Sequence, residues 1–150
     1  MDSFERFTFD IDEIFRYWHK IASDEMEKFG LKGAHAVYLI AMQRHSEGIT
    51  AAKLCELCGR DKADVSRMMN IMEEKGFVKR EGVGSNLYRA LLKLTSEGVA
   101  LAEQVRVKAM AAAEAAGRGI PCENLELLFD MLETIAENLR AMNREGIPER

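Results

Sequence analysis

Residues 49–95 read ITAAKLCELCGRDKADVSRMMNIMEEKGFVKREGVGSNLYRALLKLT, and this stretch decides the fold. Thr50 is of a residue type that caps the start of helices, and Gly59 can adopt the left-handed conformation that often ends one. The apolar residues between them recur at helical spacing, at Leu54, Leu57 and Cys58. The pattern predicts a short helix between Thr50 and Gly59.

A second helix is predicted directly after the first. Asp61 can cap it, and Asp64 stands three residues later, where a carboxylate can reach back to the amide of the capping residue. Gly76 ends the pattern after about four turns. Two helices joined by a turn of three or four residues that contains glycine are typical of the helix-turn-helix.

Two strand-like runs follow the helix pair, FVKRE at residues 77–81 and LYRALLKL at residues 87–94. The loop between them, residues 82–86, reads GVGSN and is rich in residues that turn easily. This arrangement predicts a β-hairpin, or wing, after the helix-turn-helix.

Taken in order, these segments resemble the MarR family of winged-helix regulators. The resemblance extends over roughly residues 10–143. The segments that carry it are Thr50-Ala51-Ala52-Lys53-Leu54-Cys55, Asp61-Lys62, Val65-Ser66-Arg67, Glu73-Glu74-Lys75-Gly76-Phe77-Val78 with Arg80, and Leu94-Thr95-Ser96-Glu97-Gly98. Each segment is a weak motif alone, and their order and spacing favour the family.

The resemblance implies a mainly α (α+β) fold that forms a single MarR-like domain over residues 1–150. Its winged helix-turn-helix core would span about residues 31–94, with Ile49 as a short strand in the wing sheet. Helices at about residues 10–29 and 95–143 would form a dimerisation domain, in which two chains related by a two-fold axis hold their winged helices apart.

The periodicity of the flanking segments predicts four further helices. The expected spans are Asp10 to Phe29, Leu31 to His45, Thr95 to about Gly117, and Glu123 to Asn143. The segment before Asp10 is expected to be an apolar arm with three phenylalanines. The inner face of the second of these helices is predicted to comprise Ala34, Val37, Tyr38, Ala41 and Met42.

The first and last helices carry more apolar surface than a small winged-helix core can cover, so a second copy of the chain is the simplest cover. The residues predicted at this dimer interface are Ile11, Ile14, Trp18, Leu128, Leu132, Ile135 and Leu139. The chain is therefore expected to be a homodimer.

The second helix of the motif is expected to read DNA. Its buried stripe is predicted at Val65, Met68, Met69 and Met72, and its outward positions are Lys62, Ala63, Asp64, Ser66, Arg67 and Asn70. Arg67 suits a bidentate contact to guanine, Asn70 one to adenine, and Ala63 a thymine methyl group. Lys62 and Ser66 suit phosphate. The alternative is an ordinary solvated helix face.

Asp64 is an unexpected residue on a surface that meets phosphate. Its carboxylate either accepts a hydrogen bond from cytosine or only orients Arg67 or Lys62.

The wing supplies further candidates, because Lys79, Arg80 and Arg89 flank a glycine-rich tip. Arginine is attracted into narrow minor grooves, and Arg80 is expected to leave the wing strand toward phosphate. Typical family members carry Asp-x-Arg where this chain has Asn86-Leu87-Tyr88, so the family's arginine is absent from this position. Arg89 can take its place. The predicted DNA-binding set is completed by Thr50, Lys53 and Asn86.

The composition fits a single globular domain, with 150 residues of which 47% are hydrophobic. No apolar run approaches the ~20 residues of a membrane span, and the start lacks the pattern of a secretory signal, so a cytoplasmic location without membrane contact is expected. The net charge of −4 is unevenly distributed. Residues 50–93 hold nine Lys and Arg against six Asp and Glu, whereas the rest hold 12 against 19. The attractive field for DNA is therefore confined to the winged helix.

Enzymatic and metal chemistry find little support in the sequence. No Ser-His-Asp set, paired-carboxylate signature, P-loop or GxGxxG occurs, so catalytic residues and cofactors are not expected. Cys55-Glu56-Leu57-Cys58 is a CxxC, but no second CxxC or His pair follows at zinc-finger spacing. Both thiols are therefore predicted to be small core residues, and Cys122 is the better candidate for redox sensing.

Three hypotheses follow. The first is a homodimeric regulator of transcription, a repressor that binds a pseudo-palindromic site on double-stranded DNA and is released by a small apolar or aromatic effector. The nine methionines indicate an adaptable core first, and only secondarily a pocket for that effector. The second is a winged-helix module that binds protein. The third is a cysteine-based redox or zinc sensor.

Overall fold

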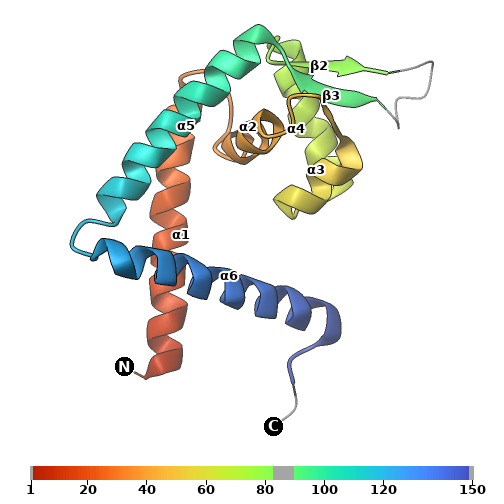
Figure 1. Ribbon diagram of the computed structural model, residues 1–150. Helices are drawn as coiled ribbons and strands as arrows, with labels where there is room; N and C mark the ends of the chain where they lie inside the picture. Colours follow the sequence, from red (N-terminus) through yellow and green to blue (C-terminus); the bar gives the residue numbers. More distant parts are fainter. Residues whose placement is uncertain (1, 83–89, 149–150) are drawn as a thin grey trace. The chain divides into compact units, whose positions relative to one another are not determined.

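The computed structural model of the protein is mainly helical, with one small antiparallel sheet (Figure 1). The structure describes residues 2–82 and 90–148. Its elements are α1 (Ser3–Glu27), α2 (His35–Gln43), β1 (Ile49–Thr50), α3 (Ala51–Cys58), α4 (Lys62–Glu74), β2 (Val78–Glu81), β3 (Leu91–Leu94), α5 (Ser96–Ala116) and α6 (Cys122–Glu145). The predicted mainly α winged helix-turn-helix fold is confirmed.

The chain divides into two units, residues 1–110 and 111–150, and α5 begins in the first and ends in the second. The winged helix lies wholly within the first unit. Among the described residues, no helix is both long enough and apolar enough to cross a membrane.

The helix-turn-helix, α3 and α4, begins and ends at the predicted residues. The side chain of Thr50 accepts a hydrogen bond from the Lys53 amide at 3.2 Å, and that of Asp61 accepts one from the Asp64 amide at 2.8 Å. Gly59 ends α3 with a φ of 60°, a left-handed conformation that glycine adopts without the strain of a Cβ. Local side-chain chemistry therefore sets the angle at which α4 leaves α3.

The sheet has the strand order β1-β3-β2, with both pairs antiparallel. Ile49 lies opposite Leu92, which confirms the predicted short strand at Ile49, and Val78 lies opposite Leu94. The predicted hairpin is present in β2 and β3, whereas Leu87 and Tyr88 lie outside the described residues.

The core of the first unit is formed where α2, α3, α4 and β3 meet. Its most deeply buried side chains include Tyr38, Leu39, Met42, Leu54, Val65, Met69, Met72 and Leu92. The predicted inner stripe of α4 is confirmed, because Val65, Met68, Met69 and Met72 are all buried. The prediction for α2 was wrong at Val37, which is 53% exposed, and its place in the core is taken by Leu39.

The start of α1 differs from the prediction. The helix begins at Ser3 and not at Asp10, because Asp2 and Glu5 form a capping box in which each side chain accepts from the backbone amide of the other. The predicted apolar arm is therefore the first two turns of the helix.

The start of α2 is also displaced, from Leu31 to His35. Residues 31–34 offer no side chain that could cap the helix, and Nδ1 of the buried His35 instead lies 2.9 Å from the Lys32 amide. This side chain satisfies an amide that would otherwise belong to the first helical turn.

Candidate nucleic-acid interface

The outer face of α4 presents polar side chains in a row. Lys62, Ala63, Ser66, Arg67 and Asn70 are all exposed, as their spacing against the buried stripe predicts. The opposite face of the helix is fixed in the core, and Asp61 fixes its first turn. The row is therefore held on a rigid element, which is what recognition of a complementary surface requires.

Asp64 departs from this row, because its side chain is only 20% exposed. Its Oδ2 accepts a 2.9 Å hydrogen bond from the hydroxyl of Tyr38 on α2, and its Oδ1 lies 3.4 Å from Nη2 of Arg67. The Tyr38 hydrogen bond, followed by that of Arg67, lowers the pKa of Asp64. Of the two predicted roles, orienting Arg67 fits this geometry, and Tyr38 is a partner that the sequence did not predict.

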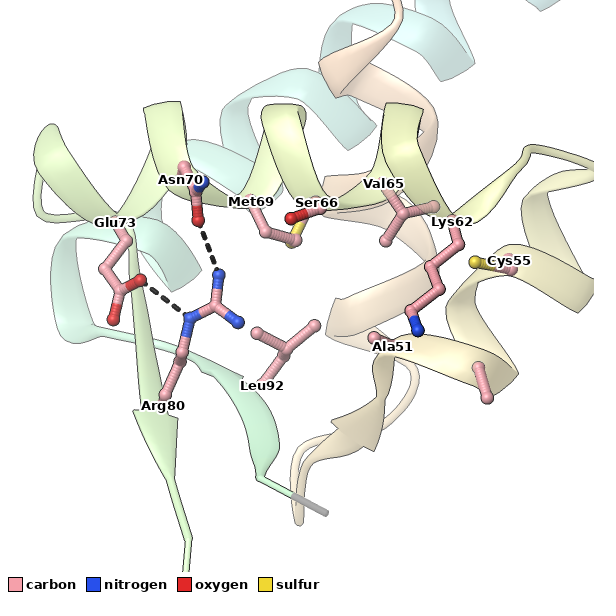
Figure 2. A pocket seen from close by; sticks show the side chains of 11 residues that line it. Ala51, Cys55, Lys62, Val65, Ser66, Met69, Asn70, Glu73, Arg80 and Leu92 are labelled. Carbon is pink, nitrogen blue, oxygen red and sulfur yellow. Dashed lines mark hydrogen bonds and ion pairs between the residues drawn. The ribbon is translucent and has the colours of Figure 1, made fainter. Parts of the chain in front are cut away.

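Arg80 on β2 lies against α4 and not free on the wing strand, and its contact with phosphate stays a prediction. Its Nε donates to Oε2 of Glu73 at 2.8 Å, and its Nη2 donates to Oδ1 of Asn70 at 2.7 Å (Figure 2). The side chain is only 25% exposed. The guanidinium therefore joins the wing to the last turns of α4.

Two other predicted cations, Lys53 and Lys79, also have partners within the chain. Lys53 pairs with Glu56 at 3.0 Å, and Lys79 pairs with Glu81 at 2.7 Å. Glu81 also lies 2.8 Å from Lys93 on β3, and these two lysines lower the pKa of Glu81 to about 2. Exposed pairs of this kind contribute little to stability, so each can exchange its carboxylate for another anion.

A cavity of about 790 Å³ lies between α4, α3 and the sheet (Figure 2). Its apolar lining comprises Ala51, Ala52, Cys55, Val65, Met69 and Leu92, and its polar lining comprises Lys62, Ser66, Asn70, Glu73 and Arg80. The surface between α4 and the wing is thus concave, with Asn70, Glu73 and Arg80 at one end (Figure 2).

The remaining predicted DNA-binding residues have other places. The hydroxyl of Thr50 is used as the cap of α3. Asn86 and Arg89, at the predicted wing tip, lie outside the described residues, so their contacts stay predictions. Sequence reasoning missed Tyr38, Glu73 and Lys93. Of these three, only Glu73 could have been found from the sequence, because it follows Asn70 by three residues and so lies on the same side of the helix.

The two cysteines of the CxxC motif, Cys55 and Cys58, are half-buried and pack against the core. Burial raises the pKa of the Cys58 thiol, which disfavours the thiolate that binds zinc or reacts with oxidants. Over residues 2–82 and 90–148, no three His, Cys, Asp or Glu side chains are grouped so that they could hold a metal ion.

A capped helix pair followed by an antiparallel hairpin defines this molecule as a winged helix-turn-helix protein. The model of the MarR family matches residues 29–85. Over these residues the winged helix resembles the MarR family, and the resemblance predicted from the sequence is confirmed.

Solved structures of similar proteins share the fold over nearly the whole chain. A protein from Listeria monocytogenes, assigned as a MarR-family transcriptional regulator and complexed with 26mer DNA, is 22% identical. It superposes with a TM-score of 0.81, and the match covers 95% of this chain and 97% of that chain. A MarR transcriptional regulator from Methanosarcina mazei Go1 is 20% identical, with a TM-score of 0.80 and coverage of 92% and 99%.

A third similar structure is that of CouR from Rhodococcus jostii RHA1, bound to p-coumaroyl-CoA. It is 21% identical, with a TM-score of 0.74, and the match covers 87% of this chain and 91% of that chain. The likeness extends to the helices that flank the winged helix.

Proposed function

We propose that the protein is a DNA-binding regulator of transcription in which α4 reads base edges in the major groove. The observation that carries the proposal is the exposed row of Lys62, Ala63, Ser66, Arg67 and Asn70 on a helix whose opposite face is buried. A second helix of a helix-turn-helix fits the major groove, and arginine and asparagine offer the donors and acceptors that distinguish base pairs there. The similar Listeria monocytogenes protein complexed with DNA supports this function.

We further propose that the protein acts as a homodimer. On α1, Ile11, Ile14 and Trp18 are 40%, 65% and 44% exposed, and on α6, Leu132 and Leu139 are 41% and 49% exposed. Leu128 and Ile135 are half-buried, and none of the described residues of α6 is fully buried. A second copy of the chain would cover these apolar side chains and place two α4 helices on a pseudo-palindromic site.

The regulator is proposed to be a repressor that an apolar or aromatic small molecule releases from DNA. The similar CouR bound to p-coumaroyl-CoA supports a ligand of this kind. The buried Met42, Met68, Met69 and Met72 give the winged helix an adaptable core that can transmit such binding.

The test begins with selection of duplexes from a randomised pool, followed by footprinting of the selected sequence. A two-headed regulator should protect two half-sites about 10 bp apart on one face of the duplex. Arg67→Ala should weaken binding by about 1–3 kcal/mol at one base pair of each half-site. The matched control is Arg60→Ala, an exposed arginine in the turn before α4, which should leave the base preference intact.

One observation favours a second function, a winged-helix module that binds protein. Lys53, Arg67, Lys79 and Arg80 each have a carboxylate partner within the chain, which reduces the positive field available to DNA. Selection that recovers no preferred duplex, together with binding to random DNA that disappears at physiological salt, would favour this second function.

A further inference from the structure

We propose that Arg80 is a positioning residue that fixes the orientation of the Asn70 carboxamide, so that Asn70 reads a hydrogen-bond acceptor on a base, as guanine offers, and not adenine. The inference rests on the proposed function. It assigns a role to the cluster of Asn70, Glu73 and Arg80 at the junction of α4 and the wing.

The chemistry of the cluster sets the direction of the amide. A guanidinium has only donors, so the group that faces it across 2.7 Å must be the amide oxygen of Asn70 and not the amide nitrogen. A hydrogen bond with an ionised donor is stronger than one between neutral groups, so reversing the amide would be costly. The Nδ2 group of Asn70 is therefore turned away from Arg80 (Figure 2).

The guanidinium that holds the amide is itself held. Glu73 accepts from Nε at 2.8 Å while Asn70 accepts from Nη2, so two partners on one side of α4 fix the plane of Arg80. The register of the sheet supports this placement, because Arg80 lies opposite Leu92, a residue that is 1% exposed. The guanidinium of Arg80 on β2 is thus a rigidly held hydrogen-bond donor beside α4.

This orientation determines which base edge is complementary. Adenine is read by asparagine through a pair of bonds, one donated to N7 and one accepted by Oδ1 from the N6 amino group. Because Oδ1 already accepts from the charged Arg80, the part of the carboxamide left free to face a base is Nδ2, and the N6 amino group of adenine would have to share an oxygen that Arg80 engages. Guanine presents two acceptors, N7 and O6, which match the Nδ2 group. The adenine contact predicted from the sequence is therefore revised to guanine.

The experiment compares the base preferences of four variants with that of the wild type, on duplexes selected with the wild type. The variants are Arg80→Met, which keeps an aliphatic stem but removes the guanidinium, Asn70→Ala, the double variant, and Lys79→Met as the matched control. Lys79 is the neighbouring strand cation, and it pairs with Glu81 on its own strand. Affinity is measured by fluorescence anisotropy for every single base-pair change in one half-site, and thermal unfolding confirms that each variant is folded.

The expected result is specific to one base pair. At the base pair that Asn70 contacts, Arg80→Met should raise the ratio of the affinity for adenine to that for guanine by about tenfold. This is the factor that one bidentate contact supplies. In the Asn70→Ala background the same change should leave that ratio where it was, because the amide through which Arg80 acts is gone. Lys79→Met should lower the affinity for all sequences alike.

Two outcomes would overturn the inference. If Arg80→Met lowers the affinity for every duplex equally, Arg80 contacts phosphate and does not position Asn70, while the proposed function stands. If the wild-type protein selects no duplex at all, the proposed function fails and this inference fails with it. Replacing the guanine by 7-deazaguanine adds an independent readout, because loss of the N7 acceptor should weaken the wild type but not Asn70→Ala.

Discussion

The hydroxyl of Tyr38 lies 2.9 Å from Oδ2 of Asp64, so a buried side chain of α2 is joined to the first turn of α4. The same carboxylate lies 3.4 Å from Arg67 through its other oxygen. The three residues form a continuous connection from the core to an exposed arginine of the recognition helix. Movement of α2 would therefore alter the side chain proposed to read guanine.

Tyr38→Phe tests this connection. Removing the hydroxyl should cost about 1–2 kcal/mol of unfolding free energy, because a buried hydrogen bond to a carboxylate is lost. Urea denaturation measures the change, and Tyr17→Phe is the matched control, since Tyr17 is 55% exposed on α1. If both variants unfold at the same urea concentration as the wild type, the Tyr38 hydroxyl does not stabilise α4.

Gly98→Ala should destabilise the protein although alanine favours helices. A Cβ at this position in the first turn of α5 would collide with the carbonyl oxygen of Phe77, at the end of the turn that leads into β2. The collision involves backbone, which side-chain movement cannot relieve, so we expect a loss of about 2 kcal/mol or more.

The control for Gly98→Ala is Ala100→Gly, an exposed position two residues further along α5. It should cost about 1 kcal/mol through helix propensity alone. A stabilising Gly98→Ala would show that propensity outweighs the contact with Phe77.

His35 should make stability depend on pH. The side chain is 0% exposed, and burial is the main cause that lowers its pKa below 6.5, with the charge of Lys32 adding to this and that of Asp64 opposing it. Below pH 6.5 the unfolded chain takes up a proton that the folded chain does not. The free energy of unfolding should therefore be constant above about pH 6.5 and fall below it, by at most about 1.4 kcal/mol per pH unit.

Urea denaturation between pH 7.5 and 5 measures this dependence. His35→Gln removes the ionisable imidazole, so its curve should be flatter than that of the wild type. The same substitution at His45, a half-buried histidine just beyond the end of α2, serves as the control. Parallel curves for wild type and His35→Gln would exclude His35 as the source.

The thiols should react in a fixed order. Cys122 is exposed at the start of α6, whereas Cys58 is half-buried and its raised pKa reduces the reactive thiolate. Limited alkylation with iodoacetamide at pH 8, followed by peptide mass analysis, should therefore label Cys122 well before Cys58. Labelling of Cys58 first would revive the CxxC motif as a redox site.

The dimer should depend on the apolar face of α6. The wild type is expected to sediment as a dimer at micromolar concentration, and Leu132→Asp should weaken association by roughly 3–6 kcal/mol because the substitution occurs in both chains. Glu133→Gln, at the neighbouring exposed position, should leave the dimer intact. A wild-type chain that sediments as a monomer would refute the proposed assembly.

Local patterns explain why much of the winged helix could be predicted from the sequence. The caps at Thr50 and Asp61 and the left-handed Gly59 depend on residues within three or four positions of each other. The capping box of Asp2 and Glu5 depends on residues that are equally close in the sequence, so the start of α1 at Ser3 could also have been predicted.

The contacts that shape the candidate site could not be predicted in the same way. Tyr38 and Asp64 are 26 residues apart, and their hydrogen bond depends on how α2 packs against α4. Arg80 meets Asn70 only because the turn after α4 returns the chain along that helix as β2. Side-chain spacing gave the exposed face of α4, but the partners of those side chains depend on tertiary packing.

The carboxylate of Glu81, shared by Lys79 and Lys93 on adjacent strands, changes how DNA binding should respond to salt. Two lysines would ordinarily neutralise two phosphates, and each neutralised phosphate releases about 0.9 of a condensed cation from the duplex. With Glu81 between them, the pair carries a net charge nearer one, so fewer cations leave the DNA. The affinity of the protein for DNA should therefore fall less steeply with ionic strength than the number of its basic residues suggests. Its affinity in dilute buffer should be correspondingly lower.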